Sequence, residues 1–164
     1  MIIPWQERST EVANLLNPAF LAVLIRDSVK DYTNKCGNSM GYSLPFIVLP
    51  VVLHRSTREK LPSSTRTALH TWLERKPDVR IGFSSRAKRL SPYVREGLLF
   101  GLQRKIFSIS ESGKLTDTNK RLGTLPGPES ADHQQCRKQA KFLGRWFAKL
   151  DDPETIYTLW GVRP

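Results

Sequence analysis

The stretch that decides the predicted fold runs from Val79 to Asn119 and reads VRIGFSSRAKRLSPYVREGLLFGLQRKIFSISESGKLTDTN. Its patterns follow the order of a winged helix-turn-helix: a short strand at 79–81, a helix at 83–90, a tight turn, a second helix and a hairpin. Ser91 is a favourable N-cap, and Pro92 suits the first helical position, where its missing N–H costs nothing. We therefore predict a recognition helix starting here, within a winged-helix module at about 63–120.

The second helix of this stretch carries an apolar stripe. Its apolar residues recur with the 3.6-residue period of a helix that lies on a core, and they are Val94, Leu98, Leu99 and Leu102. After Lys105 the residues around Phe107 are strand formers, and a glycine-containing turn at 111–114 allows 115–118 to return antiparallel. We predict that this two-stranded hairpin is the wing, and that the short strand at 79–81 pairs with it.

The residues before the module predict added helices. Helical patterns cover 4–15 and 18–34, and the second has apolar residues on more than one face, which indicates a helix buried between two layers. Residues 35–43 contain two glycines and predict a loop. Residues 44–54 fit either a buried strand or a buried helix kinked at Pro50, and we favour the helix. A further helix, TRTALHTWLERK at 65–76, is the expected first helix of the module.

The residues after the hairpin predict a linker at about 119–131 and C-terminal helices at about 129–161. The second of these helices starts at Asp152 and Pro153, a cap followed by a first-turn proline. The aromatic side chains of this part fit two alternatives, closure of the domain core or docking on a partner; they are Trp146, Phe147, Tyr157 and Trp160. The whole predicted fold is one mostly α domain, 1–164, with a minor β part.

Length and composition indicate a globular protein. The chain has 164 residues, of which 39% are hydrophobic, and no apolar run approaches the ~20 residues of a membrane span. The start of the sequence has no basic segment before an apolar stretch, so we expect no secretory signal and a cytoplasmic location. The two cysteines are far apart without a CxxC partner, which predicts free thiols.

The charge balance points to an acidic partner. There are 26 Lys and Arg against 15 Asp and Glu, a formal net charge of +11, which favours nucleic acid or an acidic protein face. Ten basic positions flank the predicted turn, lie along the recognition helix or lie at the wing, and are candidates for binding nucleic acid or a partner: Arg80, Arg86, Lys88, Arg89, Arg95, Arg104, Lys105, Lys114, Lys120 and Arg121. Because the recognition helix is apolar and has no Asn, we expect phosphate contact or protein docking rather than base-specific readout.

Few residues fit catalysis. His54 and His70 are expected to be hydrogen-bonded structural histidines, and His133 with Cys136 offers only two ligands, which does not close a zinc site. No Walker loop or GxGxxG motif is present, and the pair Gly97 and Gly101 is expected to permit close helix packing. We therefore predict a protein that is not an enzyme and uses no metal or cofactor.

Three stretches together carry a family resemblance: LPVVLHRSTREKLPSSTRTALHTWL at 49–73, RIGFSSRAKRLSPYVREGLLFGLQRKIFSI at 80–109 and FLGRWFAKLDDPETIYTLWGVRP at 142–164. They resemble the small middle component of bacterial three-component ABC-ATPase systems, to which the Lamassu antiphage systems look related. The resemblance implies an adaptor encoded beside a coiled-coil ABC ATPase of the DNA-repair type and an effector. The alternative is a stand-alone winged-helix DNA-binding regulator. The resemblance assigns no individual functional residues.

Overall fold

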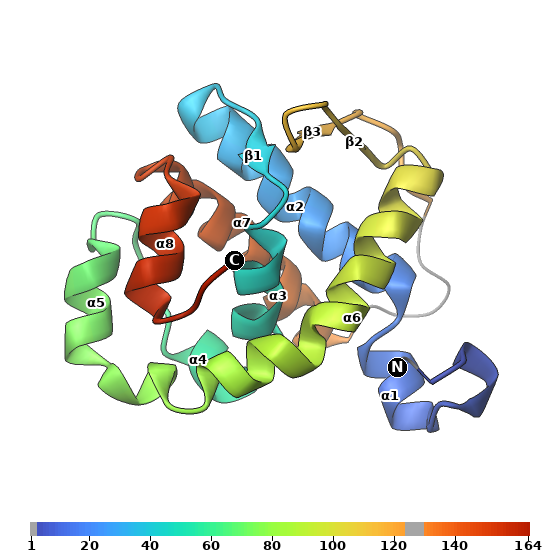
Figure 1. The fold of residues 1–164 in the computed structure, drawn as a ribbon, viewed down its shortest axis with the longest axis horizontal. Helices are drawn as coiled ribbons and strands as arrows, with labels where there is room; N and C mark the ends of the chain where they lie inside the picture. Colours follow the sequence, from blue (N-terminus) through green and yellow to red (C-terminus); the bar gives the residue numbers. More distant parts are fainter. Residues whose placement is uncertain (1–2, 124–129) are drawn as a thin grey trace.

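The computed structural model describes residues 3–123 and 130–164 (Figure 1). Helices dominate, and a small three-stranded sheet lies at one end of them. Along the chain the elements are η1 (Trp5–Glu7), α1 (Thr10–Leu15), α2 (Pro18–Cys36), β1 (Met40–Gly41), α3 (Pro45–Val52), α4 (Arg55–Glu59), α5 (Leu69–Arg75), η2 (Pro77–Arg80), α6 (Phe83–Gln103), β2 (Phe107–Ile109), β3 (Lys114–Asp117), α7 (Ala131–Ala148) and α8 (Pro153–Trp160).

Helix α2 is the central element of the fold. It starts where the side chain of Asn17 accepts a hydrogen bond from the Ala19 N–H at 2.8 Å, and it ends at Gly37, which has a φ of 79°. Ten of its side chains are buried, because α6 packs on one side of it and α7 on another (Figure 1). The prediction of a helix buried between two layers is confirmed.

Glycines let the neighbouring helices approach α2 closely. A Cβ at Gly144 of α7 would lie 2.2 Å from the carbonyl oxygen of Ser28, so that only glycine fits at this crossing. A Cβ at Gly97 of α6 would lie 2.8 Å from the Cβ of Leu21. The prediction of close helix packing is therefore confirmed at Gly97, whereas Gly144 was not singled out by the sequence.

Helix α6 corrects the predicted helix-turn-helix. It runs without interruption from Phe83 to Gln103 with Pro92 inside it, so the predicted helix boundary at Ser91 is wrong. A proline inside a helix costs about 3 kcal/mol, but Phe83 and Val94 lie on the same buried side before and after it, and each buried side chain of this size contributes about 2 kcal/mol. Packing against α2 and α3 thus outweighs a local stop signal.

The sheet has a different third strand from the one predicted. The hairpin of β2 and β3 is confirmed, with Ile109 opposite Leu115. Residues 77–80 form a 3-10 helix rather than part of a strand, because Pro77 starts a turn there. The outer edge of β3 pairs instead with β1, where Met40 lies opposite Leu115, so the predicted loop at 35–43 contains a strand.

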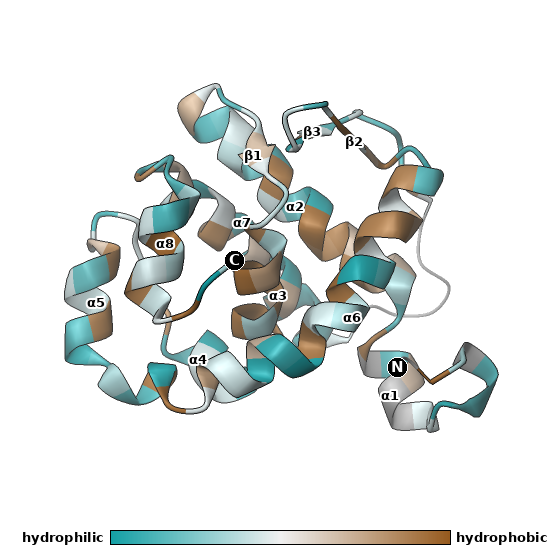
Figure 2. Ribbon diagram, in the orientation of Figure 1, coloured by the Kyte–Doolittle hydropathy of each residue, from teal (hydrophilic) through white to brown (hydrophobic). Residues whose placement is uncertain are grey.

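Helix α3 resolves the ambiguity of residues 44–54. It is a helix with Pro50 inside, as favoured, and nearly all its side chains are buried. Figure 2 shows it as a largely hydrophobic segment in the middle of the molecule, with more hydrophilic helices around it. Helix α6 and helix α7 both pack on it. A segment covered on several sides can be apolar all round.

The remaining elements agree in part with the prediction. The N-terminal segment is broken into η1 and α1, and α5 starts at Leu69, later than predicted. Helices α7 and α8 match the two predicted C-terminal helices, and Asp152 caps α8 by accepting from the Glu154 N–H at 3.2 Å. Residues 119–123 lack helix and strand, and residues 124–129 of the predicted linker lie outside the described residues. The winged helix as a whole is not confirmed.

Candidate partner interface

The ten basic candidates fall into two groups along α6. One group lies in η2 and in α6 up to residue 95, and the other lies at the end of α6, on β3 and just after β3. Residues 89 and 104 are fifteen positions apart, which is about 22 Å along a helix. The first group is Arg80, Arg86, Lys88, Arg89 and Arg95, and the second is Arg104, Lys105, Lys114, Lys120 and Arg121. All except Arg86 are exposed.

Arg86 is used inside the fold. Its Nε donates to the carbonyl oxygen of Pro50 at 3.2 Å and its Nη2 to the Thr57 hydroxyl at 3.4 Å, so it holds α6 against α3 and α4. Its guanidinium also lies over the ring of Phe83. Burial, and then the nearby charge of Arg89, lowers the pKa of Arg86. Its side chain is therefore less available to a ligand than its exposed neighbours on α6.

The second group closes the end of α6. Lys120 Nζ donates to the Arg104 carbonyl oxygen at 2.7 Å, and the Thr118 hydroxyl donates to the carbonyls of Lys105 and Ile106 at 2.6 and 2.9 Å. These bonds give donors to the carbonyl groups of the three residues that follow the helix, where the chain turns into the hairpin. Lys105 has a φ of 55°, which turns the chain from the helix into the hairpin.

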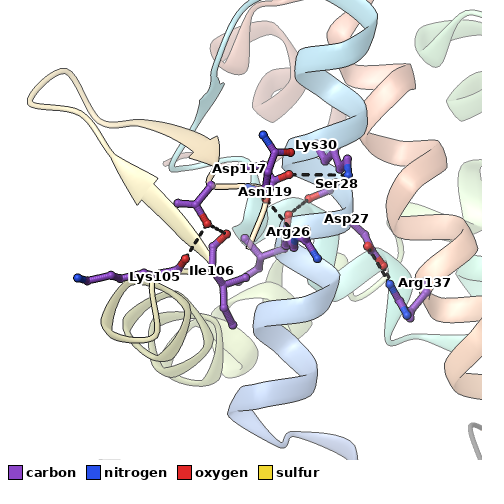
Figure 3. Close-up of polar contacts among 11 residues, drawn as sticks. Arg26, Asp27, Ser28, Lys30, Lys105, Ile106, Asp117, Asn119 and Arg137 are labelled. Atoms are coloured by element: carbon purple, nitrogen blue, oxygen red, sulfur yellow. Dashed lines mark hydrogen bonds and ion pairs between the residues drawn. The ribbon is translucent and has the colours of Figure 1, made fainter. Parts of the chain in front are cut away.

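Asp117 fastens the hairpin to α2, as Figure 3 shows. Its Oδ1 accepts from Arg26 Nε at 2.9 Å, and its Oδ2 lies 4.0 Å from Lys30 Nζ. On another side of α2, Asp27 Oδ2 accepts from Arg137 Nε at 2.7 Å, which links α2 to α7 (Figure 3). These pairs have no signal in the sequence, because nothing local relates residues about 90 to 110 positions apart.

A groove runs beside the first half of α6. Its volume is about 750 Å³, and it lies between α6, the segment 42–47 that leads into α3, and residues 162–164. Lys88 and Arg95 of the predicted set line it, and the structure adds Arg163. Within the described ranges, none of these three cations forms an ion pair. The structure thus brings two predicted residues together with a third that the sequence analysis missed.

The four aromatic candidates are buried in the core. Trp146, Phe147, Tyr157 and Trp160 are each at most 5% exposed. The Trp146 ring lies 5.4 Å from that of Trp72, and Trp160 packs against Phe83. Two of their polar atoms are used internally, since the Tyr157 hydroxyl donates to the Ser43 carbonyl at 2.7 Å and Trp146 Nε1 donates to the Thr67 carbonyl at 2.7 Å. Of the two alternatives left open, the structure places these rings in the core.

Two residues considered for chemistry have structural partners. His54 caps α4, with its Nδ1 at 2.8 Å from the Thr57 hydroxyl, and burial lowers its pKa. Cys136 is buried, and desolvation raises the pKa of its thiol. His70 is exposed on α5. The prediction that His54 is a hydrogen-bonded structural histidine is confirmed.

Arg58 is a buried cation that the sequence analysis missed. It is 2% exposed, donates to the Val52 carbonyl oxygen at 2.7 Å and contacts the Cys136 sulfur at 3.2 Å, and it pairs with Asp132. These contacts join α3, α4 and α7. No sequence signal distinguishes it from the exposed Arg55 beside it, because burial is set by α7, which lies far along the chain.

The described part of the chain contains neither a metal-binding cluster nor a membrane-spanning helix. No three or more His, Cys, Asp or Glu side chains gather there in a way that would hold a metal ion. Within residues 3–123 and 130–164, no helix combines the length and the hydrophobicity needed to cross a membrane.

The class of protein that these features define is a small, mostly helical domain with a hairpin, a buried central helix and a basic groove. Residues 5–164 match the family model described as "ABC-three component (ABC-3C) system Middle Component 3", and the chain belongs to this family. The predicted resemblance to middle components of three-component ABC systems is thereby confirmed, whereas the relation to Lamassu systems stays a prediction. No curated protein and no solved structure matches the chain.

Proposed function

We propose that this chain is a non-catalytic adaptor that joins a coiled-coil ABC ATPase of the DNA-repair type to an effector protein in an antiphage defence complex. The observation that carries the proposal is the match of residues 5–164 to a middle-component family, since a component of such a system has protein partners. The groove beside α6 supports it. Its cations lack acidic partners among the described residues, and they are available to a charged partner surface.

Co-expression with the two proteins encoded beside it tests the adaptor role. The expected result is a three-protein complex in gel filtration, in which the ATPase and the effector separate when this chain is omitted. If the chain co-elutes with neither neighbour, the proposal fails. A hydrolytic activity of the isolated chain that is lost on changing His54, His70 or His133 would contradict the non-catalytic part.

The basic end of α6 and the hairpin supports a second part of the proposal, contact with the DNA backbone when the complex engages DNA. Arg104, Lys105 and Arg121 are exposed there, and Lys or Arg contacts to phosphate make binding salt-dependent. Changing Arg104 and Arg121 to Ala should reduce the salt slope of DNA binding by the complex by about 1 for each phosphate left without its cation. An unchanged slope would remove DNA from the proposal.

The alternative function, a stand-alone DNA-binding regulator, has less support. The uninterrupted α6 lacks the predicted turn before a recognition helix. A salt-resistant preference of the isolated chain for one DNA sequence would favour this alternative over the adaptor.

A further inference from the structure

The groove beside α6 is lined by cations from two separate segments of the chain. Lys88 and Arg95 are seven positions apart on α6, so they lie on the same side of the helix, about 10.5 Å apart along its axis. Ser84 and Ser91 line the groove from the same helix. Across from α6, the segment 162–164 contributes Arg163. The cations therefore lie on facing walls.

Apolar side chains also line the groove. Phe46 and Ile47 come from the start of α3, and Tyr157 and Val162 from α8 and the segment after it. Tyr42, at the edge near the hairpin, is 53% exposed although it is a large aromatic residue. Figure 1 shows α6, α3 and the C-terminal end of the chain near one another. Residues of these three segments line the groove. An apolar lining together with these cations fits a ligand that is both apolar and anionic.

The size of the groove favours a peptide over a DNA duplex. An extended peptide covers the spacing of Lys88 and Arg95 with about three residues, at roughly 3.3 Å per residue. A duplex presents its phosphates on a convex surface, and its apolar group, the thymine methyl, lies inside the major groove, where it cannot reach Phe46 and Ile47 while the phosphates meet the cations. An acidic peptide offers carboxylates to the cations and an apolar side chain to the lining.

We propose that the groove formed by α6, residues 42–47 and residues 162–164 binds an extended acidic segment of a partner protein, anchored by at least one apolar side chain. Lys88, Arg95 and Arg163 hold the carboxylates, and the lining around Phe46 takes the anchor. Charge complementarity supports this occupant, because the chain carries a formal charge of +11 and the groove cations form no ion pair with a described residue. The inference rests on the proposed adaptor function.

A peptide array that tiles the ATPase and the effector encoded beside the chain tests this inference. The purified full chain should bind peptides that combine acidic and apolar residues. A fluorescein-labelled synthetic copy of the strongest one should then bind in solution, as measured by fluorescence anisotropy. If the array contains no such binding peptide, the inference is overturned.

Charge-reversal variants localise the binding. K88E/R95E should lower the affinity for the labelled peptide by at least about tenfold, because opposite charges in contact become like charges. K138E/K141E makes the same change in net charge at a separate hollow on α7 and serves as the matched control. K138E/K141E should bind the labelled peptide with nearly the affinity of the wild type. Equal weakening by both variants, or equal competition by a single-stranded oligonucleotide, would overturn the inference.

Co-elution separates this inference from the adaptor proposal. If K88E/R95E co-elutes with the neighbours as the wild type does and binds the labelled peptide equally well, the groove assignment fails and the adaptor role stands. If the wild type co-elutes with neither neighbour, the adaptor role fails, and the array alone decides whether the groove binds acidic peptides.

Discussion

The α2–α7 crossing and the groove beside α6 carry charge in opposite arrangements. At the crossing, Asp27 is 5% exposed and accepts hydrogen bonds from Arg137 at 2.7 and 3.2 Å. In the groove, Lys88 and Arg95 are exposed and have no acidic partner among the described residues. The crossing is close-packed through Gly144, whereas the groove is open to solvent.

The difference follows from desolvation. Burying a carboxylate costs free energy unless a partner compensates for the lost hydration. The charges at the crossing are therefore paired within the fold and are not available to a ligand. Exposed cations keep their hydration and need no partner to be stable. They remain available for binding. The comparison implies that changes at the crossing should reduce stability, and that changes in the groove should alter binding instead.

The largest effect is expected from Gly144→Ala. Its Cβ would lie 2.2 Å from the Ser28 carbonyl oxygen, so the two backbones must separate. Overpacking of this kind costs about 3 kcal/mol, which exceeds the gain of about 1 kcal/mol from replacing a helical glycine. Urea unfolding measures the resulting loss in the free energy of unfolding. Gly123→Ala, where nothing lies within 4 Å of the added Cβ, is the control. Equal stability of the two variants would contradict the close crossing.

A smaller loss is expected from Arg58→Met. Methionine keeps much of the buried volume but leaves the Val52 carbonyl without the donor that lies at 2.7 Å. The carbonyl keeps only the weak thiol donor of Cys136 at 3.7 Å, and the pairing with Asp132 is lost, which together should cost about 2 kcal/mol. Arg55→Met, an exposed change on the same helix, should cost far less in the same thermal unfolding measurement. If both variants melt alike, Arg58 is not a structural cation.

A weaker, pH-dependent effect is expected from Asp151→Asn. The Tyr32 hydroxyl and Asn38, at 2.6 Å, donate to this carboxylate and lower its pKa. Its stabilisation is therefore present above the ordinary aspartate pKa and is lost as the pH falls through the lowered folded-state value. Near neutral pH the loss should stay below about 1 kcal/mol, because the group is exposed. The substitution adds no backbone strain, because asparagine tolerates the φ of 47° that Asp151 has.

Unfolding of Asp151→Asn and wild type across the acid range checks this. The two stabilities should converge as the pH falls below the folded-state pKa of the aspartate. A constant difference at every pH would assign the effect to shape rather than charge.

The smallest effect on stability is expected from K88E/R95E, the pair that should matter most for binding. Exposed substitutions without partners usually change the free energy of unfolding by less than about 0.5 kcal/mol. Denaturant unfolding should therefore resemble that of the wild type. A loss comparable to that of Gly144→Ala would mean that the groove cations belong to the fold, and the contrast between the two regions would disappear.

Local signals in the sequence were sufficient for many helices and for the hairpin. Asn17 with Pro18 and Asp152 with Pro153 mark helix starts that the structure contains. The change to strand formers after Lys105 predicts β2 correctly. These elements are defined by capping groups and by side-chain periodicity, which act over a few residues. The exposed cations could also be selected from sequence, since charged side chains rarely lie buried.

The sequence by itself determined the mostly helical character, the buried α2 and the basic surface, because composition, caps and periodicity are local properties. Only the tertiary structure decided that α6 continues through Pro92, since its buried side extends across the proline against α2 and α3. Contacts between distant segments likewise placed Arg58 inside the fold and brought Arg163 across from Lys88. Burial and proximity depend on the partners supplied by distant segments, and a local pattern contains no record of them.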